Sequence, residues 1–244
     1  QYPDRPARPA NRLFIHDENI VGETVESKIS RIMTEVKGDL ANAILLSALD
    51  DIAWATNLRT AGDITCSPIF VAFLYLDDER RVLFIDDAKL NPETRAHLQK
   101  YHIETLPYDG VKEFVAALPK ERRLLIDPEK TARGIYDSIG CTTVFGGGNV
   151  ARLKSVKNDT MLANLAIAME KDGVALTRFF MEVERDYPSG SLTEVGLARR
   201  LRELRMADKS CVDESFTSII GWNAHGAIVH YAVSYTHLTL PTNS

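Results

Sequence analysis

Short apolar runs alternate with helix-patterned segments between residues 16 and 149, and this alternation limits the chain to a small set of folds. The apolar runs are rich in leucine, isoleucine, valine and phenylalanine, as expected for strands that are buried in a sheet. Helices between such strands indicate an α/β domain. The expected strands cover residues 43–48, 69–76, 81–85, 124–126 and 142–145, with a hairpin turn at 77–80.

Two helices of this domain carry clear start signals. Thr24 precedes a segment, residues 25–37, whose apolar side chains recur at helical spacing, and its hydroxyl suits an N-cap. Asp50 and Asp51 precede a helix expected over residues 52–58, where carboxylates favour the positive end of the helix dipole. A further helical stretch is expected near residues 130–138.

A glycine run, residues 146–149, breaks the composition and predicts a domain boundary. A phosphate-binding loop would need Gly-Lys-Ser or Gly-Lys-Thr leading into a helix, and this pattern is missing, so we interpret the run as a linker.

Two helices and a strand pair are expected after the glycine run. Apolar residues are spread around the helix predicted over 158–186, which indicates burial on more than one side. Residues 191–194 have capping-box spacing and start a helix with a leucine stripe. Residues 216–233 are expected to form a strand, a turn at Gly221 and Asn223, and a second strand.

Composition excludes several classes of protein. The 244 residues carry a formal net charge of −5, with positive side chains scattered along the chain, so nucleic acid is not an expected partner. No run approaches the ~20 apolar residues of a membrane span, so no membrane partner is expected. The three cysteines lack the Cys-x-x-Cys spacing of zinc or redox sites. We therefore expect a cytoplasmic protein.

The histidines and acidic pairs offer few candidates for chemistry. His16, His97 and His102 have polar neighbours and are expected at the surface. The three Asp-Asp pairs, which begin at residues 50, 77 and 86, are expected to serve as caps and turns. His225 and His230 lie five residues apart, which puts them on opposite faces of a regular strand and rules out a shared metal ion there. On periodicity alone, His230 fits a core histidine or a histidine that faces a site.

The segment of residues 215–231 resembles the strand that opens the active site of Xaa-Pro aminopeptidases (aminopeptidase P), which have the pita-bread (creatinase/aminopeptidase) fold. Further resemblances to the three-domain form of this family follow in the family's order and together span residues 3–233. They lie at residues 5–9 with 13–18, 47–54 with 57–59, 154–158, 171–175 and 193–194.

The resemblance implies an α/β architecture made of parts of a longer enzyme. Residues 1–15 would be a linker from a missing first domain, and 16–149 the second creatinase N-terminal-like domain. Residues 150–233 would be the truncated start of the pita-bread peptidase domain. Residues 234–244 are expected to be a non-native tail, because 233–238 resemble a translated sequencing adaptor.

The resemblance also implies a function for the complete enzyme, which is release of the N-terminal residue from peptides with a penultimate proline. His230 falls on the family's catalytic, substrate-positioning histidine, and Phe216 on an aromatic that lines the substrate pocket. Trp222, Asn223 and His225 match more loosely as possible substrate contacts.

Family members use two divalent ions, usually Mn²⁺, and commonly form homodimers. All their metal ligands lie C-terminal to the position of His230, so we expect no metal ligand and no bound ion in this chain, and no activity from it alone. A creatinase-like, metal-independent hydrolase and a catalytically dead peptide- or partner-binding module are alternatives.

Overall fold

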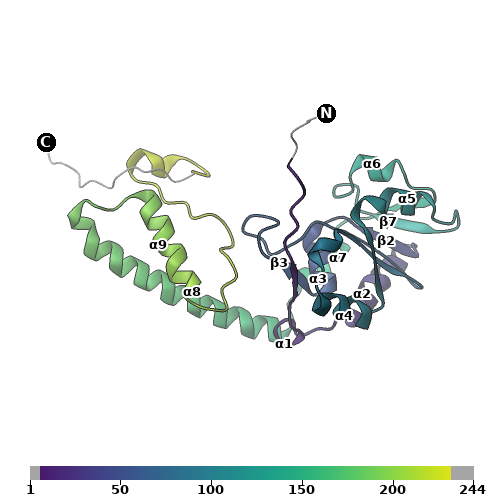
Figure 1. Cartoon of the computed structure of the whole chain (residues 1–244), viewed down its shortest axis with the longest axis horizontal. Coiled ribbons are helices and arrows are strands. Elements are labelled where there is room, and N and C mark those ends of the chain that lie inside the picture. Colours follow the sequence, from purple (N-terminus) through teal and green to yellow (C-terminus); the bar gives the residue numbers. More distant parts are fainter. Residues whose placement is uncertain (1–5, 232–244) are drawn as a thin grey trace. The chain divides into compact units, whose positions relative to one another are not determined.

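The computed structural model describes residues 6–231, and the chain divides into two compact units. The first contains residues up to 64 together with 68–162, and the second contains 65–67 together with the residues from 163 onward. Each unit is described by itself (Figure 1).

A six-stranded mixed sheet forms the centre of the first unit. Its strand order is β6-β5-β4-β2-β7-β8, with β2 parallel to β7 and antiparallel to β4. The strands are β2 (Ala43–Leu46), β4 (Phe73–Asp77), β5 (Arg81–Ile85), β6 (Ile103–Pro107), β7 (Arg123–Ile126) and β8 (Thr142–Phe145). A separate antiparallel pair joins β1 (Leu13–Ile15) to β3 (Leu58–Thr60). The predicted α/β class is confirmed.

Helices cover both faces of this sheet (Figure 1). One face carries α2 (Val25–Gly38), α3 (Leu49–Thr56), α4 (Pro92–Lys100) and α7 (Asn149–Ser155), and the other carries α5 (Val111–Ala116) and α6 (Arg133–Tyr136). The remaining short elements are α1 (Glu18–Val21), η1 (Asp87–Lys89) and η2 (Tyr108–Gly110). Thr24 caps α2 as predicted, because its hydroxyl accepts the Ser27 N–H at 3.2 Å.

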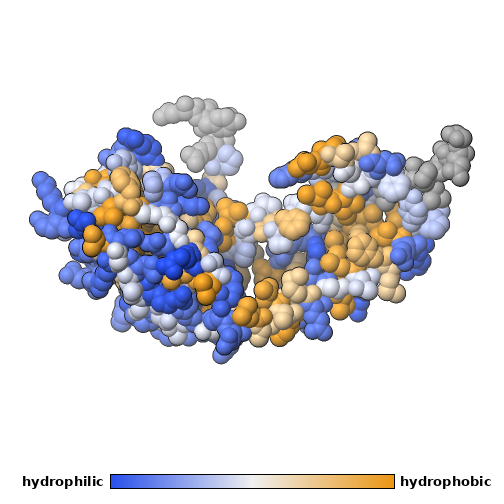
Figure 2. Space-filling model, turned by 180° about the vertical axis from the view of Figure 1, so that it is seen from behind, coloured by the Kyte–Doolittle hydropathy of each residue, from blue (hydrophilic) through white to orange (hydrophobic). Residues whose placement is uncertain are grey.

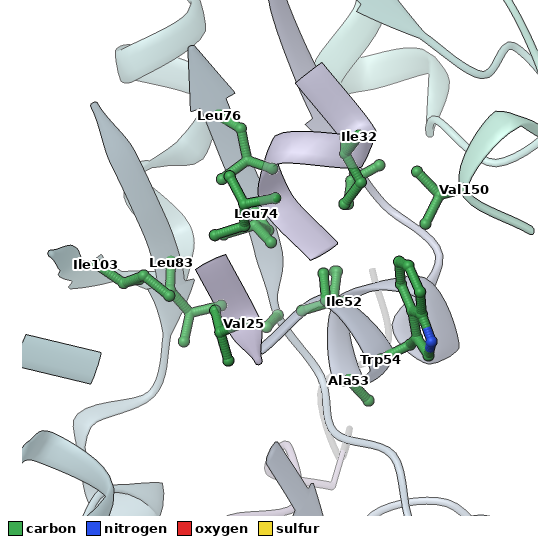
Figure 3. Close-up of a cluster of buried hydrophobic side chains, with 14 of the residues drawn as sticks. Val25, Ile32, Ile52, Ala53, Trp54, Leu74, Leu76, Leu83, Ile103 and Val150 are labelled. Atoms are coloured by element: carbon green, nitrogen blue, oxygen red, sulfur yellow. The ribbon is translucent and has the colours of Figure 1, made fainter. Parts of the chain in front are cut away.

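The pleat of β2 divides the interior into two cores. Ile44 and Leu46 join the core under α2 and α3, whereas Ala43 and Leu45 join the core under α5. Side chains from helices and strands converge in the first of these cores (Figure 3). A strand buried on both faces reads as a continuous apolar run, which is why its sequence shows no alternation.

The first unit continues beyond the glycine run that was expected to end it. Val150 and Leu153 of α7 are buried in the first core, and Figure 3 shows Val150 with Ile32 and Trp54. The division falls after Leu162 instead of at 149/150. The glycines form the loop that leads into α7, and Gly148, at φ 78°, takes the left-handed conformation immediately before that helix.

Part of the predicted N-terminal linker also belongs to this unit. Leu13–Ile15 is strand β1, the Lys89 Nζ donates to the Pro9 carbonyl at 2.6 Å, and the Thr60 hydroxyl donates to the Arg12 carbonyl at 2.9 Å. Lys89 is itself buried and paired with Asp63.

The described part of the second unit is helical. It contains most of α8 (Asp159–Asp186), together with η3 (Tyr187–Ser189), α9 (Glu194–Met206) and η4 (Asn223–Ala227). Leu197 and Leu201 of α9 pack against Phe179 of α8. Thr193 caps α9 by accepting the Gly196 N–H at 3.0 Å, so the predicted start at residue 191 is two residues early.

Two predictions for this unit were wrong for the described residues. Helix α8 was expected to be buried on several sides, yet only Ala175 and Phe179 of it are buried. Hydrophobic residues are correspondingly visible on the second unit at the right of Figure 2, and those exposed on α8 include Leu165, Ile167, Met169, Phe180 and Met181. Residues 216–231 form no strand, because no neighbouring strand in the described part of this unit offers hydrogen bonds to them.

The central strand β4 provides a test of the packing. Leu74 is fully buried between α2 and the sheet, so we expect Leu74→Ala to lower the free energy of unfolding of the first unit by about 3 kcal/mol. Leu40→Ala, at a side chain that is 74% exposed, should change it by less than about 0.5 kcal/mol. Urea unfolding followed by Trp54 fluorescence in a Trp222→Phe background measures both, and equal losses would contradict this packing.

Limited trypsin digestion tests the extent of the first unit. Arg152 and Lys154 lie in α7, whose apolar face is buried, so we expect the protected fragment to end beyond Lys157. Val150→Asp should release α7 and expose the two sites. Mass spectrometry that finds rapid cleavage at Arg152 in the unmodified chain would place the boundary near the glycine run instead.

Candidate active-site loop

The two predicted site residues, Phe216 and His230, both lie on the surface of the second unit. Phe216 is 65% exposed in an irregular segment, and His230 is exposed in a turn that follows η4. Within residues 6–231 the structure gives neither of them a hydrogen bond, an ion pair or a ring contact. The structure therefore does not assemble these two residues into a pocket.

His230 has an unusual backbone. Its φ of 57° lies in the left-handed region, and Asn223 at the start of η4 has a φ of 50°. Non-glycine residues rarely adopt this conformation, and such residues are concentrated at turns and functional sites. The residues from Trp222 to Tyr231, which we name the histidine loop, are thus bent sharply near both ends.

The carboxylate of Glu194, a buried residue outside the predicted site, accepts hydrogen bonds from several residues of this loop. Glu194 Oε1 accepts the backbone N–H of Trp222 at 2.7 Å, and its Oε2 accepts the Tyr231 hydroxyl at 2.6 Å. The Nδ1 of His225 lies 3.0 Å from Oε1. The Glu194 side chain is 0% exposed, so these bonds form away from bulk water.

The position of Glu194 follows from the start of α9. Thr193 supplies the cap, which leaves the Glu194 carboxylate available to the histidine loop, and the first turn of a helix favours a negative charge. Leu197 and Leu201, one and two turns further on, fix α9 against α8. Sequence reasoning gave residues 193–194 only a helix-start role and missed this contact.

The hydrogen bonds also define the state of His225. A carboxylate only accepts, so the Nδ1 that faces Glu194 carries the proton, and the Tyr231 oxygen 2.8 Å away accepts from it as well. In the neutral ring Nε2 then holds the lone pair. Trp222 packs beside Tyr187, with ring centroids 5.7 Å apart, and its indole N–H is buried without an acceptor in the described residues.

The segment resembling the family's second-domain signature, residues 47–54 with 57–59, builds a different cluster inside the first unit. The Lys28 Nζ donates to the Asn57 Oδ1 at 2.6 Å and to the Trp54 carbonyl at 3.1 Å, and it lies 4.9 Å from the Trp54 ring centroid. Asn57 holds the left-handed cap of α3, with φ 52°. The Arg59 guanidinium donates to the Ala53 and Leu58 carbonyls.

Burial lowers the pKa of three cationic groups around this cluster. Loss of hydration, with Arg59 adding repulsion, lowers the pKa of Lys28 to about 8 and that of His16 to about 4. Burial also lowers the pKa of Arg59 to about 10.

Two of the histidines expected at the surface are not exposed. His16 is half-buried, and His97 is buried with its Nε2 2.9 Å from the Thr56 carbonyl oxygen, so both predictions were wrong. His102 is exposed as predicted.

Two of the three acidic pairs serve a turn and a cap, as predicted, whereas Asp50 and Asp51 lie within the first turn of α3, which starts at Leu49 and has no side-chain cap. Asp77 Oδ1 accepts the Glu79 and Arg80 N–H groups at 2.7 and 2.6 Å, and Asp86 caps η1. Asp50 and Asp51, at the start of α3, also bind Lys154 of α7.

The described residues do not fit a metal centre. Within residues 6–231 no three His, Cys, Asp or Glu side chains lie close enough together to hold an ion. The rest of the sequence adds only Asp4 and His237 of these types. Likewise, none of the helices between residues 6 and 231 has the length and hydrophobicity needed to cross a membrane.

Lys28 should make the stability of the first unit depend on pH. Its pKa is about 8 when folded and near 10.5 when exposed, so the unfolded chain binds more protons between these values and stability rises with pH there. We expect the rise to amount to about 2–3 kcal/mol. Urea unfolding across this range should show the rise in the native chain and its loss in Lys28→Met. An equal pH slope in both proteins would contradict the lowered pKa.

Comparisons with known proteins agree with this architecture. The sequence profile of the Creatinase/Prolidase N-terminal domain matches residues 4–161. Aminopeptidase P2 of Arabidopsis thaliana is 30% identical, and Xaa-Pro aminopeptidase 1 of Dictyostelium discoideum 31% identical, each over 93% of this chain and 36% of the relative. The chain thus spans about a third of the length of these relatives.

A solved structure, the X-prolyl aminopeptidase of Caenorhabditis elegans, superposes with a TM-score of 0.80 at 25% identity over 88% of this chain and 36% of that one. That protein is described as a cytosolic enzyme with a dinuclear active site. Since the matching profile covers more than half of the sequence, the chain belongs to the creatinase/prolidase family.

Proposed function

We propose that this chain is part of an Xaa-Pro aminopeptidase, which releases the N-terminal residue from peptides with a penultimate proline. The observation that carries the proposal is the extent of the match to such enzymes. The domain profile ends at residue 161, but the relatives from Arabidopsis and Dictyostelium match 93% of the chain, which necessarily includes residues of the second unit. A chain that shared only the creatinase-type N-terminal domain with these relatives would not be expected to match them in the second unit as well.

The role we propose for His230 is a hydrogen bond to the substrate. The bond before proline is a tertiary amide without an N–H, so the enzyme must grip its carbonyl and the flanking groups instead of the amide proton. An imidazole N–H directed at the carbonyl oxygen stabilises the negative charge that develops there. His230 is exposed on the described surface and is therefore accessible to a peptide, as is Phe216, to which we assign a contact with the substrate side chain.

The metal ions of such an enzyme would be held outside this chain's described residues. We propose two divalent ions, because the Caenorhabditis relative is described as having a dinuclear active site. Mn²⁺ is the species that the family resemblance implies. When bound, such ions supply a hydroxide nucleophile at neutral pH. Residues 6–231 hold no group of three potential ligands, so the role we assign to them is contact with the substrate. A cytoplasmic location and a homodimer complete the proposal.

The first test compares two histidines in a full-length protein that carries this sequence. We expect His230→Ala to lower kcat/KM on an Xaa-Pro peptide by about 100-fold or more, because it removes a hydrogen bond to the developing charge. The His225→Ala variant keeps His230, so its kcat/KM should fall much less. Similar small losses in both variants would contradict a catalytic role for His230. Turnover that persists after metal removal would indicate the creatinase-like alternative, and no turnover in the unmodified protein would indicate a binding module.

A second test uses the chain as it stands, residues 1–244. We expect no release of the N-terminal residue from an Xaa-Pro peptide, even with Mn²⁺ added, because the ligands that would lower the pKa of a bound water are missing from the described residues. The full-length protein under the same conditions is the control. Manganese-dependent turnover by the purified chain would show that the catalytic centre lies within it.

A further inference from the structure

The histidine loop is closed into a ring by one side chain of a different element. Its first and last residues, Trp222 and Tyr231, both donate to Glu194, at 2.7 and 2.6 Å. The residue next to the second anchor is His230. A single buried carboxylate on a helix thus fixes the two ends of the segment that carries the proposed catalytic histidine.

We propose that Glu194 is a positioning residue, which sets the conformation of the histidine loop and the tautomer of His225. This inference rests on the proposed function for its catalytic consequence, but its structural part does not. The Glu194 side chain is fully buried, so it would act through His230 and not by touching the substrate.

Energetics favour this role over that of a surface ion pair. A buried carboxylate is stable only when its oxygens accept good hydrogen bonds, and here the donors are a backbone N–H, a phenol and an imidazole. Replacing one of the two carboxylate oxygens by an amide NH₂ would remove the acceptor that Glu194 offers to either the Trp222 N–H or the Tyr231 hydroxyl. The loop would then lose its closed conformation, and the left-handed backbone of His230 would lose the anchor beside it.

The carboxylate also fixes the His225 ring. Glu194 Oε1 holds the proton on Nδ1, and the Tyr231 ring lies 4.8 Å from the His225 ring, centroid to centroid. The ring is thereby held between two partners, and its Nε2 is presented as an acceptor. Glutamine in place of Glu194 has nearly the same shape, but one of its terminal atoms is a donor that cannot accept from these groups.

The matched pair of variants is Glu194→Gln and Glu203→Gln, which make the same change on the same helix. Glu203 is an exposed partner of Arg200, so its loss should leave the loop unaltered. In the present chain, we expect ¹⁵N NMR to find His225 with the proton on Nδ1, and to find this preference lost in Glu194→Gln only. Hydrogen exchange of residues 222–231 should become at least about tenfold faster in that variant.

In the full-length protein, Glu194→Gln should lower kcat by roughly 10- to 100-fold, because small displacements of a catalytic group carry losses of this size. A double variant with His230→Ala should be no slower than His230→Ala alone, since Glu194 acts through that histidine. Multiplicative losses in the double variant, or an unchanged His225 tautomer in Glu194→Gln, would overturn the proposal.

A gentler variant keeps the test decisive if Glu194→Gln does not fold. Tyr231→Phe removes one donor and leaves the carboxylate, so we expect faster exchange in the loop and a smaller loss of kcat than for Glu194→Gln. Unchanged exchange in Tyr231→Phe would count against the anchor. Should the unmodified full-length protein not turn over Xaa-Pro peptides, the proposed function fails, while the tautomer and exchange results still decide the structural role of Glu194.

Discussion

The burial of β2 on both faces is the constraint on which the first unit depends. Its four side chains all lie in the interior, and alternate ones enter the cores on opposite sides of the sheet. Helices must therefore cover both faces, which requires crossover connections and hence the α/β alternation along the chain. The parallel pairing of β2 with β7 follows from such a connection, because parallel neighbours cannot be joined by a tight turn.

The sequence predicts the α/β class and five of the six strands of the large sheet because their signals are local, whereas it did not predict β6 or the pair β1 and β3. The strands at 43–46, 73–77 and 81–85 are short apolar runs, and the cap at Thr24 lies next to the helix it starts. The domain boundary was misplaced because a glycine run indicates a loop. It does not reveal whether the helix after the loop packs onto the preceding unit or belongs to the following one. Val150 and Leu153 decide that question by packing with α2 and α3, which lie about a hundred positions earlier in the chain.

The histidine loop was harder to predict, for a related reason. A strand is stabilised by its neighbours, so a pair of β-branched residues such as 228–229 forms one only where a partner strand exists. The contact with Glu194 joins residues 28 to 37 positions apart, and no periodicity connects them. A glutamate after a threonine at a helix start already has a local explanation as a dipole-favoured residue. That explanation does not reveal its second role: Thr193 supplies the cap, and the Glu194 carboxylate binds the histidine loop.

Two buried charges show how differently the two units use electrostatics. Lys28 is held by an amide and a carbonyl oxygen in the first unit, and its lowered pKa shows that these neutral partners do not fully replace water. Glu194 instead accepts hydrogen bonds from Trp222, His225 and Tyr231, which all belong to one loop. Each of these hydrogen bonds also fixes a part of that loop. The first arrangement fixes the junction of α2 and α3 at a cost in stability. The second makes the conformation of the histidine loop depend on one carboxylate, and places that carboxylate on a helix whose buried face also packs against Trp222 of the loop.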